Sequence, residues 1–103
     1  MSRPSPPATD TWTKRARMPT VRGGLAAVAF GGRIYTYGGE TTTSVFPEHE
    51  VYDATADRWT SAPSLPTPRH GLGAALLDGR IYVIGGGPQA GLAQSDVVEV
   101  YTP

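Results

Sequence analysis

The chain carries one pattern of hydrophobic and polar residues twice. Residues 23–30 and 71–77 are short runs rich in Ala, Gly and Leu, whereas residues 33–39 and 80–86 are β-branched and aromatic and end in a glycine pair. In each copy of the pattern, the first run is joined to the second by "GG" or "DG", which is a strong short-range signal for a β-hairpin. The pattern therefore predicts two antiparallel hairpins, and no segment keeps the 3.6-residue period of a helix.

Two further strand types follow from the pattern. Residues 49–53 and 97–101 alternate polar with apolar side chains, which favours a third strand in each set. Residues 11–19 and 58–66 each place a Trp near the start and a Pro at the end, which suits a strand at an outer edge. With the types named a, b, c and d in the order of the first complete set, the chain reads d-a-b-c-d-a-b-c.

The two sets are copies of one another. An offset of 47 residues aligns side chains of unrelated kinds, namely Trp12 with Trp59, Pro19 with Pro66, Arg22 with Arg69, and Leu25 with Leu72. About half of the positions in residues 12–39 are identical to their counterparts, and only one loop changes in length. Repeats of this period are units that stack on one another, because one unit alone does not bury its apolar face.

These residues carry a family resemblance. An Arg before an apolar strand, then "IYxxGG", a loop, "VYD" and a Trp resemble the kelch repeat, whose copies form the blades of a β-propeller. The resemblance implies an all-β fold with two four-stranded antiparallel blades in permuted strand order. We expect the first blade at about residues 20–66, the second at about residues 67–103, and a flexible lead-in at residues 1–10.

The second repeat departs from the family pattern, because it has Tyr101 but no Trp after it. Kelch-type propellers close when a strand from one terminus completes the blade made by the other. We therefore expect residues 11–19 to complete the second blade of a neighbouring chain. A homotrimer with six blades is the favoured assembly, and a tetramer with eight is the second arrangement. The alternative is a piece of a longer propeller, or a chain that depends on another protein.

Composition excludes several classes of function. Nine basic residues balance nine acidic ones, so no broad field attracts nucleic acid or a membrane surface. The chain has no cysteine, which excludes disulfides and thiolate metal sites, and no apolar run long enough to span a bilayer. The N-terminal residues do not have the apolar core of a signal peptide. We expect a soluble, cytoplasmic protein without a cofactor.

Arg22, Arg69 and His70 are the candidate ligand-binding residues, because they precede the innermost strands. By resemblance such arginines line the mouth of the propeller, where a planar guanidinium suits a carboxylate. The alternative is that they bind loop carbonyls and hold neighbouring blades together. The loops at residues 41–50 and 88–94 are expected to lie on the same rim and to supply specificity.

Most other prominent residues are expected to be structural. The glycine pairs relieve backbone crowding at the end of strand b, and no helix follows them to make a phosphate-binding loop. The aromatic residues are expected to pack between blades. These structural positions are Gly38, Gly39, Gly85, Gly86, Tyr35, Tyr82, Tyr52, Tyr101, Trp12 and Trp59.

The sequence gives little support to catalysis or metal binding. Glu48, His49 and Glu50 are consecutive, so their side chains alternate in direction, and a solvated loop is the favoured interpretation. Three copies of His70 at a ring axis would be held too far apart for one metal ion. We therefore predict a protein-binding or scaffold module, not an enzyme. The alternatives are a carbohydrate-acting enzyme of the kelch-like epimerase type, and a propeller fragment or designed assembly without a ligand.

Overall fold

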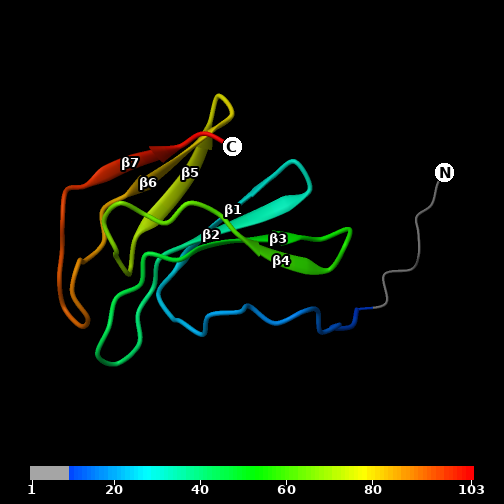
Figure 1. The fold of residues 1–103 in the computed structure, drawn as a ribbon, viewed down its shortest axis with the longest axis horizontal. Helices are drawn as coiled ribbons and strands as arrows, with labels where there is room; N and C mark the ends of the chain where they lie inside the picture. The colour runs from blue at the N-terminus through cyan, green and yellow to red at the C-terminus, as the bar shows by residue number, and fades with distance from the viewer. Residues whose placement is uncertain (1–9) are drawn as a thin grey trace.

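Seven strands form two antiparallel sheets in the computed structural model, which describes residues 10–103 (Figure 1). The described residues contain no helix, as the sequence predicts. Nearly all of the lead-in predicted at residues 1–10 lies outside the described residues. The fold is therefore all-β, with one sheet for each sequence repeat.

The first sheet is a four-stranded meander. Its order is β1-β2-β3-β4, and its strands are β1 (Ala26–Phe30), β2 (Arg33–Tyr37), β3 (His49–Asp53) and β4 (Arg58–Ser61). Gly31 and Gly32, with φ of 61° and 78°, make the β1–β2 turn. Two consecutive positive φ values match the turn that joins twisted hairpin strands, and glycine adopts them without strain.

The second sheet repeats the first without its fourth strand. Its order is β5-β6-β7, and its strands are β5 (Gly73–Leu77), β6 (Arg80–Ile84) and β7 (Val98–Tyr101). Asp78 and Gly79, with φ of 52° and 74°, form the hairpin turn. Asp is among the few residues other than Gly that tolerate this conformation. Within the described residues, no strand pairs with the outer side of β7.

The core lies between the two sheets. Tyr35 and Val51 on the first sheet face Ile81 and Val83 on the second, and all four side chains are buried. Tyr101 packs against this cluster from β7. The core is therefore an interface between two blades, which is how a repeat protein buries apolar surface that one unit exposes.

Residues 11–19, predicted as a strand, form none in the single chain. In Figure 1 this blue segment runs along one side of the first sheet, and β5–β7 lie on the other side. Its Trp12 is fully exposed. A strand needs an edge to pair with, and this segment pairs with none of the seven strands.

The two innermost strands are more exposed than an Ala-rich strand buried on both faces would be. On β1, Ala26 is buried, but Ala27 and Ala29 are exposed. On β5, Leu76 and Leu77 are exposed. Runs of Ala, Gly and Leu suit a strand that is buried on both faces, but the single chain does not bury these strands in this way.

Candidate functional site

Arg22 is completely buried at the end of the first sheet. Its guanidinium donates to Glu50 Oε1 at 2.9 Å, to Thr36 Oγ1 at 3.1 Å, and to the carbonyl of Gly38. Thr20 Oγ1 donates to the other carboxylate oxygen of Glu50 at 2.7 Å. A buried charge is tolerated only when it is paired and hydrogen-bonded, and both charges of this pair meet that condition.

Arg69 repeats the arrangement in the second sheet. Its guanidinium donates to Glu99 Oε1 at 2.8 Å and to the carbonyls of Gly85 and Val97 at 2.8 and 3.2 Å. Thr67 Oγ1 donates to Glu99 Oε2 at 2.8 Å, as Thr20 does to Glu50. In the single chain, both guanidinium groups are directed at protein partners. Their contacts match the structural alternative, in which the arginines bind loop carbonyls.

His70 lies where two rim loops meet. Its Nε2 is 3.5 Å from Glu40 Oε2, and the other oxygen of that carboxylate accepts from the backbone N–H of Gly91 at 3.0 Å. Glu40 therefore links the loop after β2, the start of the second repeat and the loop after β6. Of the three predicted binding residues, His70 alone retains partial exposure at this rim.

The loop after β6 presents an apolar side chain to solvent. Leu92 is fully exposed, and with Ala93 and Gln94 it lines an open hollow. The adjoining Gly91 is held by Glu40 through the hydrogen bond described above. Leu92 is therefore an accessible apolar side chain next to an anchored backbone position.

The expectation of a solvated loop at Glu48, His49 and Glu50 is wrong for two of the three residues. His49 and Glu50 begin β3 and are 2% and 4% exposed. Their side chains do alternate: His49 enters the interface between the sheets, and Glu50 meets Arg22. Each position is buried because it has a partner, which sequence proximity alone does not reveal.

A polar cluster that the sequence analysis missed lies between the sheets. The Tyr37 and His49 rings stack with centroids 4.2 Å apart, and Tyr101 meets His49 edge-on at 4.5 Å. His49 Nδ1 contacts the Pro63 carbonyl at 3.0 Å, so Nδ1 carries the proton and Nε2 is an acceptor. The Tyr37 hydroxyl and His49 Nε2 are buried, and neither has a hydrogen-bond partner among the residues that the structure describes.

The second repeat holds the signal that could have revealed this cluster. The positions that match Tyr37 and His49 are Ile84 and Val98, so a polar pair stands where the copy is aliphatic. Burial is the main cause that lowers the pKa of His49, and the nearby Arg22 charge lowers it further, against the hydrogen bond to Pro63. Burial, with Tyr101 and Tyr35 nearby, raises the pKa of Tyr37 well above its ordinary range. Both side chains are therefore neutral at physiological pH.

A small pocket of about 210 Å³ adjoins the cluster. The segment after β4 closes one side of this pocket with Pro63, Leu65 and Pro66. Tyr101 closes another side. The pocket is mostly apolar and lies between the two repeats.

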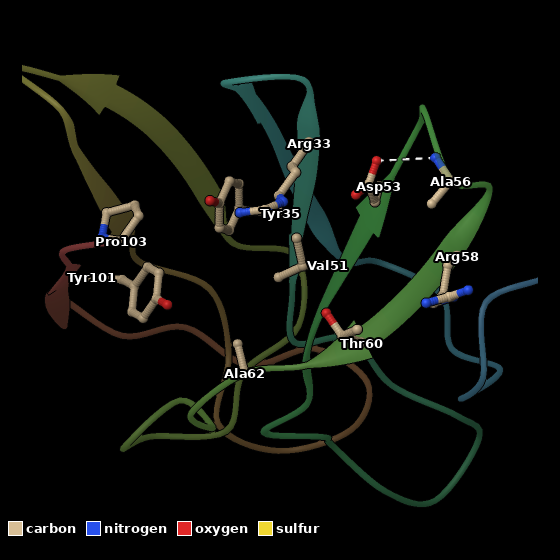
Figure 2. Close-up of a pocket in the computed structure, with 10 residues that line it drawn as sticks. All are labelled: Arg33, Tyr35, Val51, Asp53, Ala56, Arg58, Thr60, Ala62, Tyr101 and Pro103. Atoms are coloured by element: carbon tan, nitrogen blue, oxygen red, sulfur yellow. Dashed lines mark hydrogen bonds between the residues drawn. The ribbon is translucent and has the colours of Figure 1, made fainter.

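A larger cleft of about 410 Å³ opens between the sheets on the side away from the rim loops (Figure 2). One wall is the face of the first sheet, and the C-terminal end of the second sheet forms the other. The lining residues are Arg33, Tyr35, Val51, Asp53, Ala56, Arg58, Thr60, Ala62, Tyr101 and Pro103. The inter-sheet cleft, as we name it, is apolar at its base and charged at its mouth.

The predicted structural residues lie in different surroundings, and Trp12 is fully exposed. Tyr35 and Tyr101 pack between the sheets with centroids 6.1 Å apart, whereas Tyr52 and Trp59 pair at 5.1 Å on the opposite face of the first sheet. Tyr82 is half-buried. The crowding predicted at the glycines is present at three of the four, Gly38, Gly39 and Gly86, where a Cβ would meet backbone oxygen.

Residues 10–103 contain neither a cluster of metal-binding side chains nor a membrane-spanning helix. These residues contain no group of three or more His, Cys, Asp or Glu placed to hold a metal ion. The same part of the chain contains no helix long and apolar enough to cross a membrane. The candidate surfaces described above are the rim loops and the inter-sheet cleft.

Comparison with known proteins identifies the repeat. The kelch motif matches residues 22–66, a range that contains the whole first sheet. Residues 22–66 carry the kelch motif, and the chain as a whole fits the kelch repeat family. Its two antiparallel sheets are consistent with kelch propeller blades, and the second sheet has three strands within the described residues.

Two similar proteins place this kelch chain in context. The Kelch-like protein terF of Aspergillus terreus is 51% identical over 41 residues, which cover 36% of this chain and 9% of that protein. The solved structure of YjhT is similar with a TM-score of 0.71 and 26% identity, over 77% of this chain and 25% of that one. The kelch chain thus spans a quarter or less of the length of either protein.

Proposed function

We propose that the chain is a protein-binding or scaffold module in which copies join into one kelch propeller. A homotrimer with six blades is the favoured ring, and a tetramer with eight is the second arrangement. The observation that carries the proposal is an apolar surface on the second sheet, which we call the outer face. It consists of the exposed side chains of Leu77, Ile84, Val98 and Val100.

The first sheet indicates what covers such a face. The residues that match Ile84, Val98 and Val100 in the first repeat are Tyr37, His49 and Val51, and the second sheet buries all three. Apolar patches of this kind on a soluble domain commonly mark interaction surfaces. A second copy of the chain offers a blade of matching shape, so its first sheet is the proposed cover.

Solution mass tests the assembly. Light scattering after size exclusion, over a dilution series, is expected to give a discrete species of about three times the 10.9 kDa chain mass. Val98→Asp is expected to leave single chains, because it buries a charge in the contact. Thr43→Asp on an exposed loop is the matched control and should assemble normally. Single chains of the unaltered protein at all concentrations would contradict the proposal.

The rim loops are the proposed contact with a protein partner. The loops after β2 and β6 lie on one rim, where Glu40 connects them and Leu92 is fully exposed. A ring of three chains would present each loop three times, so weak single contacts would add up to useful avidity. The ring and the rim loops therefore support the same function.

A displayed random-peptide library tests the rim. Panning against the assembled protein is expected to enrich peptides whose binding falls about tenfold or more with Leu92→Asp. Thr55→Asp, in the exposed β3–β4 turn on the opposite rim, is the control and should leave binding unchanged. Equal binding by the two variants would place the contact elsewhere.

A further inference from the structure

We propose that Trp12 of one copy fills the inter-sheet cleft of another, with residues 10–17 as the fourth strand beside β7. This inference rests on the proposed assembly and names the contact that joins the copies. Three observations lead to it: no strand among residues 10–103 pairs with the outer edge of β7, the cleft beside this edge is open, and Trp12 is fully exposed.

The first sheet supplies the template for this contact. Tyr52 and Trp59 are cross-strand partners between β3 and β4, and their rings lie 5.1 Å apart. Asp57, two residues before Trp59, has φ of 51°. Asp10 has the same φ of 51° two residues before Trp12, although no strand follows it in the single chain. The segment thus already has the backbone turn that precedes the fourth strand.

The cleft lies where the template requires a tryptophan. Tyr101 is the repeat counterpart of Tyr52, and its ring faces the first sheet beside Val51 and Ala62 (Figure 2). A strand paired with β7 in the template register sets Trp12 opposite Tyr101 and turns its indole toward the same side. The indole would then occupy the apolar base of the cleft.

A hydrogen-bond partner for the indole is present as well. Trp59 Nε1 donates to the Ala16 carbonyl at 2.8 Å, and the residue 47 positions after Ala16 is Pro63. The inserted Trp12 Nε1–H is therefore expected to donate to the Pro63 carbonyl. That carbonyl already contacts His49 Nδ1 at 3.0 Å, and its second lone pair is available.

Charges agree with this register. When Trp12 stands opposite Tyr101, Lys14 stands opposite Glu99, and continuing the same register beyond the end of β7 would bring Arg17 opposite Asp96. Opposite charges in directly facing positions stabilise a strand pair, and like charges destabilise it. A shift of one residue would turn every side chain of the strand to the other face, so the pairs favour one register.

The segment is held on the far side of its own first sheet. Arg15 Nη2 donates to the Ala54 carbonyl at 2.8 Å, and the Ala16 N–H donates to Asp57 Oδ1 at 2.8 Å. The chain's own second sheet packs on the other face of the first sheet. Trp12 is therefore presented where the second sheet of another copy would dock, away from its own cleft.

Cysteine pairing between chains tests the insertion, because the chain has no cysteine of its own. Val51 and Thr60 are paired in the template, so their counterparts are Val100 and Thr13. Chains with Thr13→Cys are mixed with chains with Val100→Cys and oxidised mildly. We expect a disulfide-linked heterodimer, and a control mixture of Thr13→Cys with Thr102→Cys, two residues out of register, should give little of it.

Fluorescence and mass separate this inference from the assembly itself. In a Trp59→Phe chain, Trp12 is the single tryptophan, and its emission should shift to shorter wavelength over the concentrations at which the mass rises. Trp12→Ala should raise the concentration needed for assembly about tenfold or more. Assembly with Trp12 still exposed and no heterodimer would overturn the insertion and leave the ring. The strand that pairs with β7 would then come from another part of the chain or from another protein. The absence of any assembly would overturn both.

Discussion

At the scale of single residues, the two buried arginines behave as structural groups. Arg22 and Arg69 each neutralise a glutamate of the third strand and bind carbonyls at the end of the second. The sequence revealed both positions, since they align in the repeat, but their role depends on burial. Burial depends on which loops fold over the guanidinium, and residue type and spacing do not report that.

Arg22→Leu is expected to lower the free energy of unfolding by about 3–5 kcal/mol, because it leaves the Glu50 carboxylate buried without its partner. Arg80→Leu is the matched control: Arg80 is exposed, so we expect a change within about 0.5 kcal/mol. Urea denaturation of both variants at neutral pH measures the difference. Equal losses would show that the buried pair adds nothing specific.

His49 should make stability depend on pH. Its pKa is lowered in the folded chain, chiefly by burial and also by Arg22. The unfolded chain binds the proton more readily, so this contribution is complete above the ordinary histidine pKa of about 6.5 and is lost as the pH falls below it.

The matched substitution is His49→Val, because the second repeat has Val98 at this position. Between pH 7.5 and pH 5.5, the stability of the unaltered chain should fall by up to about 1.4 kcal/mol per pH unit more than that of the variant. Urea midpoints over this range measure both slopes. Glu50 contributes at lower pH, since the bonds from Thr20 and Arg22 outweigh burial and leave its pKa lowered. Identical slopes above pH 5.5 would exclude His49 as the cause.

At the scale of elements, six of the seven strands follow closely from hydrophobic pattern and turn chemistry, and β4 covers the first part of its predicted range. Residues 11–19 do not form the predicted strand, because their sequence pattern does not say which strand edge they would pair with. A strand also needs a free edge in the right place, and the chain's own free edge at β7 lies across the first sheet from this segment.

The glycine pairs give an element-scale prediction. A Cβ on Gly38 would collide with the carbonyl oxygen of Arg69, whereas on Gly85 it would have its nearest neighbour at 3.8 Å. Both glycines have positive φ, so Gly85→Ala should cost about 1–2 kcal/mol of stability from backbone strain alone. Gly38→Ala should cost clearly more, because the link to the second repeat must move. Thermal unfolding of the two variants compares them, and equal costs would contradict the steric argument.

At the scale of the whole molecule, the two repeats form one structural unit through their shared interface. Tyr101 reaches from β7 to Tyr35, Tyr37 and His49 on the first sheet. The repeat in the sequence predicted this stacking of blades, because neither copy alone can cover its apolar face. The polar cluster inside the interface escaped prediction, because two matching positions differ in chemistry and only the fold brings them together.

Tyr101→Ala should therefore destabilise the chain at every concentration by about 2–4 kcal/mol, since it removes a ring from the interface. Tyr82→Ala is the matched control on the outer face of the second sheet, where Tyr82 is half-buried. We expect its effect to be small in dilute solution and to grow where copies assemble. Urea denaturation at two concentrations checks this. Equal losses from both variants in dilute solution would contradict this picture of the interface.

The second repeat has Ile84 and Val98 where the first has Tyr37 and His49. This difference determines which contact between blades acid would weaken first. In a ring of these chains, blade contacts would alternate between a titratable kind inside each chain and an aliphatic kind between chains. Acid would then weaken each chain in its own middle, while the seams between chains stayed closed. In acid, such a ring would therefore lose stability first at the contact between the two blades of each chain, and not at the contacts between chains.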